Sequence, residues 1–273
     1  MTRWLVTGCS TGIGRAIATA ALDAGHSVVV TARRPETVQD LAEQYPEQAL
    51  AVRLDVTDRE QISAAVDRAL AEFGGLDVLI NNAGYGYLSA VEEGDDAEVR
   101  ALFDTNFFGA VDMIKAVLPT MRAQGHGHIL NVSSMTGIVT NPPNTYYSCT
   151  KHAMEALTEG LAKEVEPFGI KVCAIEPGAF RTDYITRSMH EASSLADYQH
   201  VNDRKELIRA FGAHLPGDPA KLAATVLDLV EMENPPLRLL LGQDVLRAFR
   251  EKSQAWSESV DEWEPVTRSM NFD

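Results

Sequence analysis

The stretch TGCSTGIG, Thr7 to Gly14, decides how the rest of the sequence is interpreted. It follows a short apolar run and precedes a helical pattern, which is the context of a strand-to-helix turn. Its glycines at 8, 12 and 14 suit a tight turn, close approach of the backbone to a pyrophosphate, and close packing of the helix on the strand. The stretch therefore predicts a phosphate-binding turn, and an ordinary tight turn is the alternative.

Short β-branched runs alternate with longer helical patterns along the chain. Several of these runs are apolar throughout, as expected for parallel strands that are covered on both faces. The alternation predicts an α/β fold: a single-domain Rossmann-type, doubly wound parallel sheet of about seven strands flanked by helices. The predicted strands are Trp4–Thr7, Ser27–Thr31, Leu50–Leu54, Asp77–Ile80, His128–Val132, Lys171–Ile175 and Leu237–Leu241.

Several helix starts are recognisable from their capping residues. Thr57 and Glu60 form an S/T-x-x-E pattern, which predicts a capping box before the next helix. Asp218 followed by Pro219 is typical of an N-cap and the first helical position. Long helical patterns cover Asp95–Gln124 and Tyr147–Phe168.

The chain is predicted to form one domain over residues 1–245. Within it, residues 184–215 carry no strand pattern, and we interpret them as a lid over the site. Residues 246–273 are acidic and aromatic, with Trp256 and Trp263, and are predicted to form a tail docked on the domain.

Composition excludes several classes of partner. A formal net charge of −15 over 273 residues argues against nucleic acid and anionic membranes, since both attract basic surfaces. No apolar run approaches the roughly 18 residues of a membrane span, and the chain enters a strand too early for a signal peptide. Three widely spaced cysteines indicate reduced thiols without a metal site. We expect a cytoplasmic protein.

The segment YYSCTK, Tyr146 to Lys151, holds a candidate acid–base pair. On a helix, Tyr147 and Lys151 lie on one face because they are four residues apart, whereas Tyr146 projects elsewhere. An ammonium beside a phenol favours the phenolate form. A surface pair is the alternative, because this spacing alone is common.

Six motifs in sequence order resemble those of the short-chain dehydrogenase/reductase family, in the branch without a separate substrate domain. The resemblance covers roughly residues 3–245, and the second serine of NVSS stands thirteen residues before Tyr147, as in the family. The segment NNAGYGYLSAVEE and the long tail are most similar to steroid- and retinol-dehydrogenase-like members. The motifs are TGCSTGIG, LDVTD with Asp55, NNAG (Asn81–Gly84), NFFG with Asn106, NVSS (Asn131–Ser134) and PGAFRT (Pro177–Thr182).

The resemblance implies a catalytic group formed by Asn106, Ser134, Tyr147 and Lys151. By this analogy Tyr147 is the general acid/base, Ser134 holds the substrate oxygen together with it, and Lys151 also binds the nicotinamide ribose. Asn106 holds a water in a proton relay. The cofactor would contact Gly8, Ser10, Thr11, Gly12, Ile13, Gly14, Arg33, Arg34, Asp55, Val56, Asn82, Ala83, Gly84, Tyr147, Lys151, Pro177 and Thr182.

The end of the second strand, VVVTARRP, predicts the cofactor. Folds that bind NAD usually place an acidic residue there, on the ribose 2′-hydroxyl, but this chain has Ala32. Arg33 and Arg34 follow, and guanidinium groups pair with phosphate, so we expect NADP(H). A solvated basic turn is the alternative.

The expected activity is hydride transfer between NADP(H) and the carbonyl or alcohol group of a hydrophobic small molecule. Two alternatives are a non-catalytic NADP(H)-sensing protein and an extended-branch epimerase, although the epimerase lacks support from the glycine spacing. The family's long helices commonly pair, so a homodimer or homotetramer is expected. The apolar candidates for lining the pocket, for which packing is the alternative, are Tyr85, Tyr87, Leu88, Phe180, Tyr184 and Met189.

Overall fold

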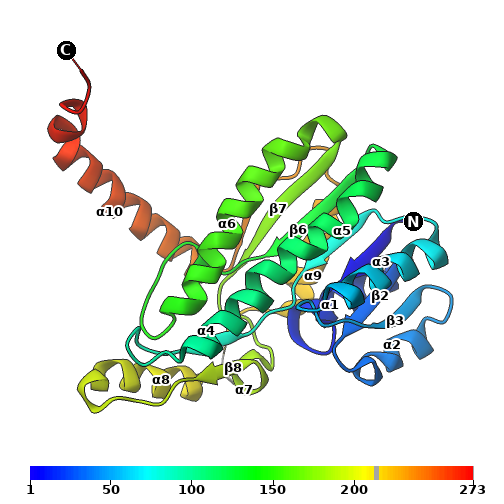
Figure 1. Cartoon of the computed structure of the whole chain (residues 1–273), viewed down its shortest axis with the longest axis horizontal. Helices are drawn as coiled ribbons and strands as arrows, with labels where there is room; N and C mark the ends of the chain where they lie inside the picture. Colours follow the sequence, from blue (N-terminus) through cyan, green and yellow to red (C-terminus); the bar gives the residue numbers. More distant parts are fainter. Residues whose placement is uncertain (212–214, 273) are drawn as a thin grey trace.

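The computed structural model describes residues 1–211 and 215–272 and confirms the predicted fold class. Seven parallel strands form one sheet in the order β3-β2-β1-β4-β6-β7-β9, with a crossover at β1 that makes the sheet doubly wound (Figure 1). All seven predicted strands are present. They are β1 (Arg3–Val6), β2 (Ser27–Ala32), β3 (Ala49–Arg53), β4 (Val78–Asn81), β6 (Gly127–Val132), β7 (Ile170–Pro177) and β9 (Arg238–Leu241).

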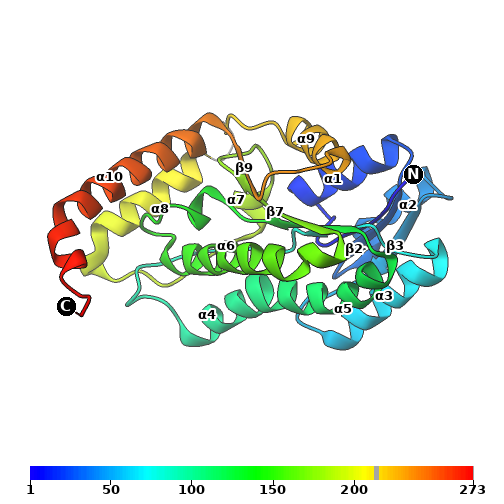
Figure 2. The ribbon, with the colours of Figure 1, turned by 90° about the horizontal axis from the view of Figure 1, so that it is seen from above.

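Helices cover both faces of this sheet, as seen from above in Figure 2. Helices α1 (Gly12–Asp23), α2 (Gln39–Gln44) and α9 (Pro219–Glu231) pack on one face. Helices α3 (Arg59–Phe73), α5 (Gly109–Gln124) and α6 (Thr145–Val165) pack on the other. The predicted long helix 95–124 is one continuous rod made of α4 (Asp96–Phe103), a π-helical turn η2 (Asp104–Phe108) and α5.

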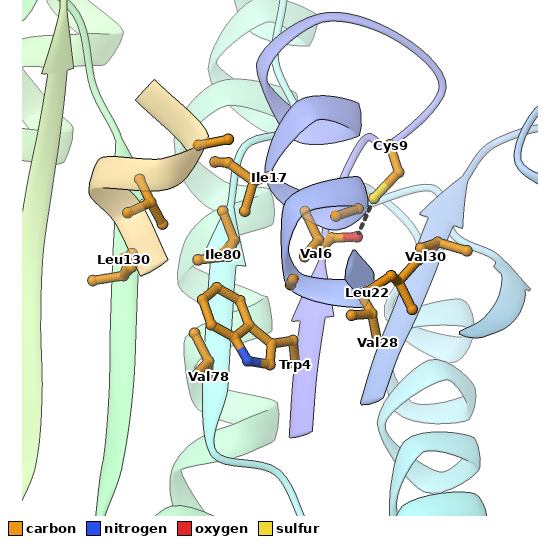
Figure 3. Packing of buried hydrophobic residues seen from close by; sticks show 14 of the residues in the cluster. Trp4, Val6, Cys9, Ile17, Leu22, Val28, Val30, Val78, Ile80 and Leu130 are labelled. Atoms are coloured by element: carbon orange, nitrogen blue, oxygen red, sulfur yellow. Dashed lines mark hydrogen bonds between the residues drawn. The ribbon is translucent and has the colours of Figure 1, made fainter. Parts of the chain in front are cut away.

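Alternating side chains of the strands fill two separate cores. Trp4 and Val6 point to the α1 and α9 side, where they pack with Ile17 (Figure 3). Leu5, between them, points to the opposite core beneath α3 and α5. Both faces of the strand are therefore buried, which explains why the strands are continuous apolar runs in the sequence.

Of the two helix caps predicted from the sequence, one is confirmed and the other is wrong. Asp218 accepts a hydrogen bond from the Ala220 amide at the start of α9, as predicted. Asp95, where no cap was predicted, caps α4. The capping box predicted at Thr57 is wrong: Asp58 caps α3 by accepting from two backbone amides. Thr57 instead bonds the carboxylate of Asp55, which an adjacent acidic residue makes possible.

The predicted lid contains a strand, contrary to the sequence prediction. β8 (Met189–Glu191) pairs in parallel with β5 (Gly86–Leu88) and forms a second, two-stranded sheet. Its helices are α7 (Tyr184–Arg187) and α8 (Gln199–Phe211), and residues 212–214 lie outside the described residues. Lys205 of α8 anchors this segment through a buried ion pair with Glu93, at 2.8 Å.

The C-terminal segment differs most from the prediction of a docked tail. It forms helix α10 (Gln243–Arg268), which leaves the layered body and points away from the sheet (Figure 1). Every side chain from Ser253 to Phe272 is exposed. Among the described residues, the contacts that hold the helix lie at its base: Val245 is buried, and Lys252 donates to the Ile138 carbonyl. No helix in the described part of the chain combines the length and apolar character needed to cross a membrane.

Candidate active site

The carboxyl ends of β1, β4, β6 and β7 bring the predicted site residues to one edge of the sheet. Gly8 and Gly12, in the turn after β1, have positive φ angles of 72° and 63°, which side chains other than glycine rarely adopt. A Cβ at Gly14 would lie 2.2 Å from the Asn82 amide nitrogen, so only glycine fits there. Ser10, Thr11 and Ile13 lie half-buried in the same turn.

Thr7 and Asn82 hold the turn against the end of β4. The Asn82 side-chain amide donates to the carbonyls of Thr7 and Gly8, at 2.8 and 3.0 Å. The Thr7 hydroxyl accepts from the backbone amides of Asn82 and Ala83, each at 2.9 Å. These four bonds fix the glycine turn against β4, and no described side chain caps the N-terminus of α1.

The loop after β7 lies next to the glycine turn. A Cβ built on Gly12 would be 3.6 Å from the Thr182 Cβ, which places Thr182 beside the turn although 170 residues separate them. The Thr182 hydroxyl accepts from the Tyr184 amide at 3.2 Å. Asp244 of α10 accepts from the Ala179 amide at 2.7 Å and fixes the middle of this loop, which starts at Pro177.

Tyr147 and Lys151 lie together on α6, as their spacing predicts. The Lys151 ammonium is 5.7 Å from the centre of the Tyr147 ring and donates to the Val132 carbonyl at 2.7 Å. The lysine is buried, and the tyrosine ring is partly exposed toward the site. Tyr146 faces elsewhere, because its hydroxyl donates to the Val91 carbonyl at 2.8 Å.

Asn106 reaches the same place from the π-helical turn η2. Its amide nitrogen donates to the Tyr85 carbonyl at 2.8 Å, and its oxygen accepts from the Tyr85 amide at 3.0 Å. The same nitrogen lies 3.3 Å from the Thr150 hydroxyl, which bonds the Tyr147 carbonyl. Gly84 lies between Asn106 and Lys151, since a Cβ there would approach the amide oxygen of the first and the ammonium of the second.

Ser134 lies two residues after β6 and caps a short 3₁₀ helix, η3 (Met135–Gly137), that packs against α6. Its hydroxyl accepts from the Thr136 amide at 3.2 Å, and its side chain is partly exposed. The four predicted catalytic side chains therefore come from η2, from the segment after β6 and from α6.

Tyr184 of α7 closes the site over Tyr147, with 6.2 Å between the ring centres. Its hydroxyl is buried and has no hydrogen-bond partner in the described residues. Burial, and then the neighbouring Tyr147, raise the pKa of Tyr184 well above its usual value. The sequence marked Tyr184 only as an apolar lining residue. Of the other lining residues, Tyr87 and Leu88 are buried in the fold.

A buried carboxyl cluster beneath the site was missed by the sequence reasoning. Glu176 is the last residue but one of β7, directly before Pro177, and is 1% exposed, with neither carboxylate oxygen hydrogen-bonded in the described residues. Burial and the nearby Glu155 raise the pKa of Glu176 to about 8. Arg238 bonds Glu155 at 3.1 Å and lies 3.9 Å from Glu176. The sequence feature that could have revealed this cluster is a glutamate that directly follows an apolar strand pattern.

The residues predicted to select the cofactor lie at the ends of β2 and β3. Arg33 and Arg34 are exposed, and neither forms an ion pair with any described residue. Asp55 accepts two bonds from Thr57, and the adjacent Val56 is buried against Gly109. Two guanidinium groups thus face solvent near the glycine turn in a chain of net charge −15.

Comparisons with known proteins agree with this geometry. Residues 3–192 match the family model described as short chain dehydrogenase. A crystal structure of a short-chain dehydrogenase from Streptomyces avermitilis is similar, with a TM-score of 0.93 and 42% identity, covering 99% of this chain and 98% of that chain. ElxO, solved with NADP bound, has a TM-score of 0.75 and 28% identity, covering 90% of this chain and 99% of that chain.

Two curated relatives match over almost their whole length. Oxidoreductase BOA17 of Botryotinia fuckeliana is 39% identical over 266 residues, which are 97% of each chain. The 3-ketodihydrosphingosine reductase of Bacteroides thetaiotaomicron is 37% identical over 262 residues, which are 92% of this chain and 91% of the relative.

Proposed function

We propose a specific activity for this chain, which belongs to the short-chain dehydrogenase family. The proposed reaction is reversible hydride transfer between NADP(H) and a ketone or secondary alcohol of a hydrophobic small molecule. The observation that carries it is the convergence of Tyr147, Lys151 and Asn106 at the edge of the sheet that holds the glycine turn, with Ser134 two residues after the Val132 carbonyl that Lys151 bonds.

The residues present fit a dinucleotide. The turn at Gly8, Gly12 and Gly14 leads into α1, whose N-terminal amides have no side-chain cap among the described residues, and we propose that these amides bind the pyrophosphate. Arg33 is the proposed partner of the 2′-phosphate, because its guanidinium offers several charge-assisted hydrogen bonds. We propose that Asp55, Val56, Asn82, Ala83, Pro177 and Thr182 contact the rest of the cofactor. In support, Asn82 and Ala83 lie beside Gly8, and Thr182 lies beside Gly12.

Each catalytic side chain has a proposed task in ketone reduction. The bound cofactor supplies the hydride to the carbonyl carbon. The Tyr147 hydroxyl gives its proton to the carbonyl oxygen, and Ser134 donates a hydrogen bond to the same oxygen as negative charge develops on it. Lys151 stabilises the phenolate that Tyr147 becomes. Asn106 holds the backbone of Tyr85 at the site, where we propose that it also positions a water for proton return.

A hydrophobic substrate is supported by the residues above Tyr147. Tyr184 covers the phenol, and Met189 and Tyr85 lie nearby at the β5–β8 sheet. The name of one relative, 3-ketodihydrosphingosine reductase, is that of an enzyme for a long-chain ketone. The substrate class proposed here is therefore an apolar ketone or the corresponding alcohol.

The paired substitutions Tyr147→Phe and Tyr146→Phe test the proposal. Tyr147→Phe should abolish NADPH-dependent reduction of a panel of apolar ketones, while NADPH still binds in a fluorescence titration, because only the phenolic proton is lost. Tyr146→Phe removes the same group one position away and should keep activity near wild type. Full activity of Tyr147→Phe, or wild-type binding of NADPH without turnover of any ketone, would reject the proposed reaction.

A further inference from the structure

Helix α10 carries an apolar stripe that nothing in the described part of the chain covers. Trp256, Val260 and Trp263 are 66%, 54% and 56% exposed, and Phe249 nearer the base is 42% exposed. The stripe follows alternate steps of three and four residues, which keep it on one side of a helix and are typical of a coiled-coil seam. The seam positions are Leu246, Phe249, Ser253, Trp256, Val260, Trp263 and Thr267.

We propose that α10 pairs with α10 of a second copy of this chain, in antiparallel orientation. The inference goes beyond the proposed catalytic function. It also concerns a different surface from the long helices that the family commonly uses for pairing. The apolar seam explains why an exposed helix keeps two tryptophans, since contiguous exposed apolar patches mark interaction sites. Two further observations identify the occupant as a second copy and set the orientation.

The first observation is the alternation of large and small residues along the seam. In an antiparallel pair centred near Glu258, Ser253 of one helix lies opposite Trp263 of the other, and Trp256 lies opposite Val260. Phe249 then lies opposite Thr267. Each layer combines a large and a small side chain, as well-packed cores do. A parallel pair would instead place tryptophan against tryptophan and serine against serine.

The second observation is the charge asymmetry of the helix. Between Leu246 and Ser253 it carries three basic residues and one acidic residue, whereas between Ser257 and Glu264 it carries four acidic residues and no basic one. Antiparallel pairing sets the basic half of each helix beside the acidic half of the other. Arg250 and Glu264 flank the seam and meet across the pair, twice by symmetry. Arg268 occupies only the Oε1 atom of Glu264, so Oε2 is available.

The base of the helix fits this arrangement. Val245 is fully buried, and Asp244 and Lys252 bond the domain, so α10 leaves the body in a fixed direction. With a rise of about 1.5 Å per residue, its 26 residues extend about 39 Å, long enough for several seam layers between two bodies.

The first experiment measures the mass of the full chain by light scattering after size exclusion. Trp256→Glu combined with Trp263→Glu should give half the mass of the wild type, with unchanged circular dichroism. A wild type with the same mass as this variant would overturn the proposal. Binding of a monomeric wild type, but not of the variant, to phosphatidylcholine vesicles would overturn it in favour of a lipid surface.

A charge exchange distinguishes a second copy from any other partner, and it does not disturb the seam. Arg250→Glu should raise the dissociation constant of the pair about tenfold, because two like-charge contacts replace two attractive ones. Adding Glu264→Arg should restore the wild-type value. Arg247→Glu is the matched control, since it makes the same change on the outward side of α10 and should have no effect. Failure of the double variant to recover would overturn the antiparallel pair.

Cross-linking tests the orientation. In a Cys149→Ser background, which removes the exposed cysteine, Ser257→Cys lies near the symmetry axis of the antiparallel pair. A short bismaleimide linker should join two chains through it. Ser253→Cys should not cross-link, because its two copies would be about 15 Å apart along the axis. Cross-linking through Ser253→Cys but not Ser257→Cys would show a parallel pair and overturn the proposed orientation.

Discussion

At the scale of single residues, we propose that Arg33, at the end of a strand, selects the cofactor. Ala32 closes β2 without the acidic side chain that NAD-binding folds place there, and the exposed Arg33 follows it. Arg33→Ala should raise the KM for NADPH by roughly ten- to a hundredfold, which corresponds to about 1.5–3 kcal/mol for a bond to a charged group. The KM for NADH should hardly change. Initial-rate kinetics with both cofactors check this, and equal wild-type KM values for the two would contradict it.

Glu176 ties stability to pH. Its pKa of about 8 exceeds the usual 4.5, so the native state binds this proton more tightly than the unfolded chain does. The resulting stabilisation is complete below the unfolded value and is lost as the pH rises toward 8. Glu176→Gln keeps a neutral group, so its unfolding free energy relative to wild type should rise between about pH 5 and about pH 9.

Urea denaturation at the two pH values measures this difference. Glu159→Gln is the control, because Glu159 also contacts Arg238 but is exposed, and the bonds from Lys163 and Arg238 lower its pKa. That control should show no such rise. A stability difference for Glu176→Gln that stays constant with pH would contradict the raised pKa.

The positions of single residues could be predicted from the sequence where those residues belong to a local motif. Tyr147 and Lys151 lie together on α6 as their spacing indicated, and Asn106 contacts Thr150 of the same helix. The contact of Tyr184 with Tyr147 depends on how the chain folds back after β7, and the Glu176–Glu155 cluster joins residues from separate elements. Neither contact can be predicted from the spacing of residues along the sequence.

At the scale of elements, α8 depends on one buried ion pair. Lys205 and Glu93 are 2% and 0% exposed, and Glu93 also accepts from the amides of Ala90 and Leu195. Lys205→Met should destabilise this segment by about 3 kcal/mol, because the carboxylate stays buried without its partner. Hydrogen exchange of the α8 amides should accelerate before global unfolding.

Arg209→Met is the matched control on the same helix. Arg209 also pairs with a glutamate, Glu191, but is half exposed, and exposed pairs contribute little to stability. Its exchange rates should stay close to wild type. Equal effects of the two substitutions would show that burial does not decide the strength of the Lys205 pair.

Long, buried strands could be predicted from the sequence, whereas short strands could not. The seven sheet strands are apolar on both faces and stand out in the sequence, whereas β5 and β8 have three residues each and pair across a hundred residues. The cap of α3 is Asp58 and not the predicted Thr57. Both residue types cap helices, so the residue type alone does not tell which of the two stands at the N-cap.

At the scale of the whole molecule, the alternation of strands and helices predicted the doubly wound sheet, but not the position of α10. Its tryptophans indicate an apolar contact, and a docked tail was one way to provide it. The direction of β9 and the bonds at Asp244 and Lys252 point the helix outward instead. The proposed pairing of two α10 helices would cover these tryptophans, and the mass of the full chain in solution tests it.

The π-helical turn η2 carries Asn106, and its geometry can change without changing how the helices on either side pack on the core. A π turn is an α-helix with one residue inserted, so the helices on either side, α4 and α5, keep the rotational phase of a single rod. Removing one residue from an ordinary helix turns everything beyond it by about 100°. Removing one residue from η2 would convert the π turn that carries Asn106 into an ordinary α turn. The buried faces of α4 and α5 would stay aligned. A single-codon deletion would therefore dismantle this corner of the site while the helix stays in register with the core.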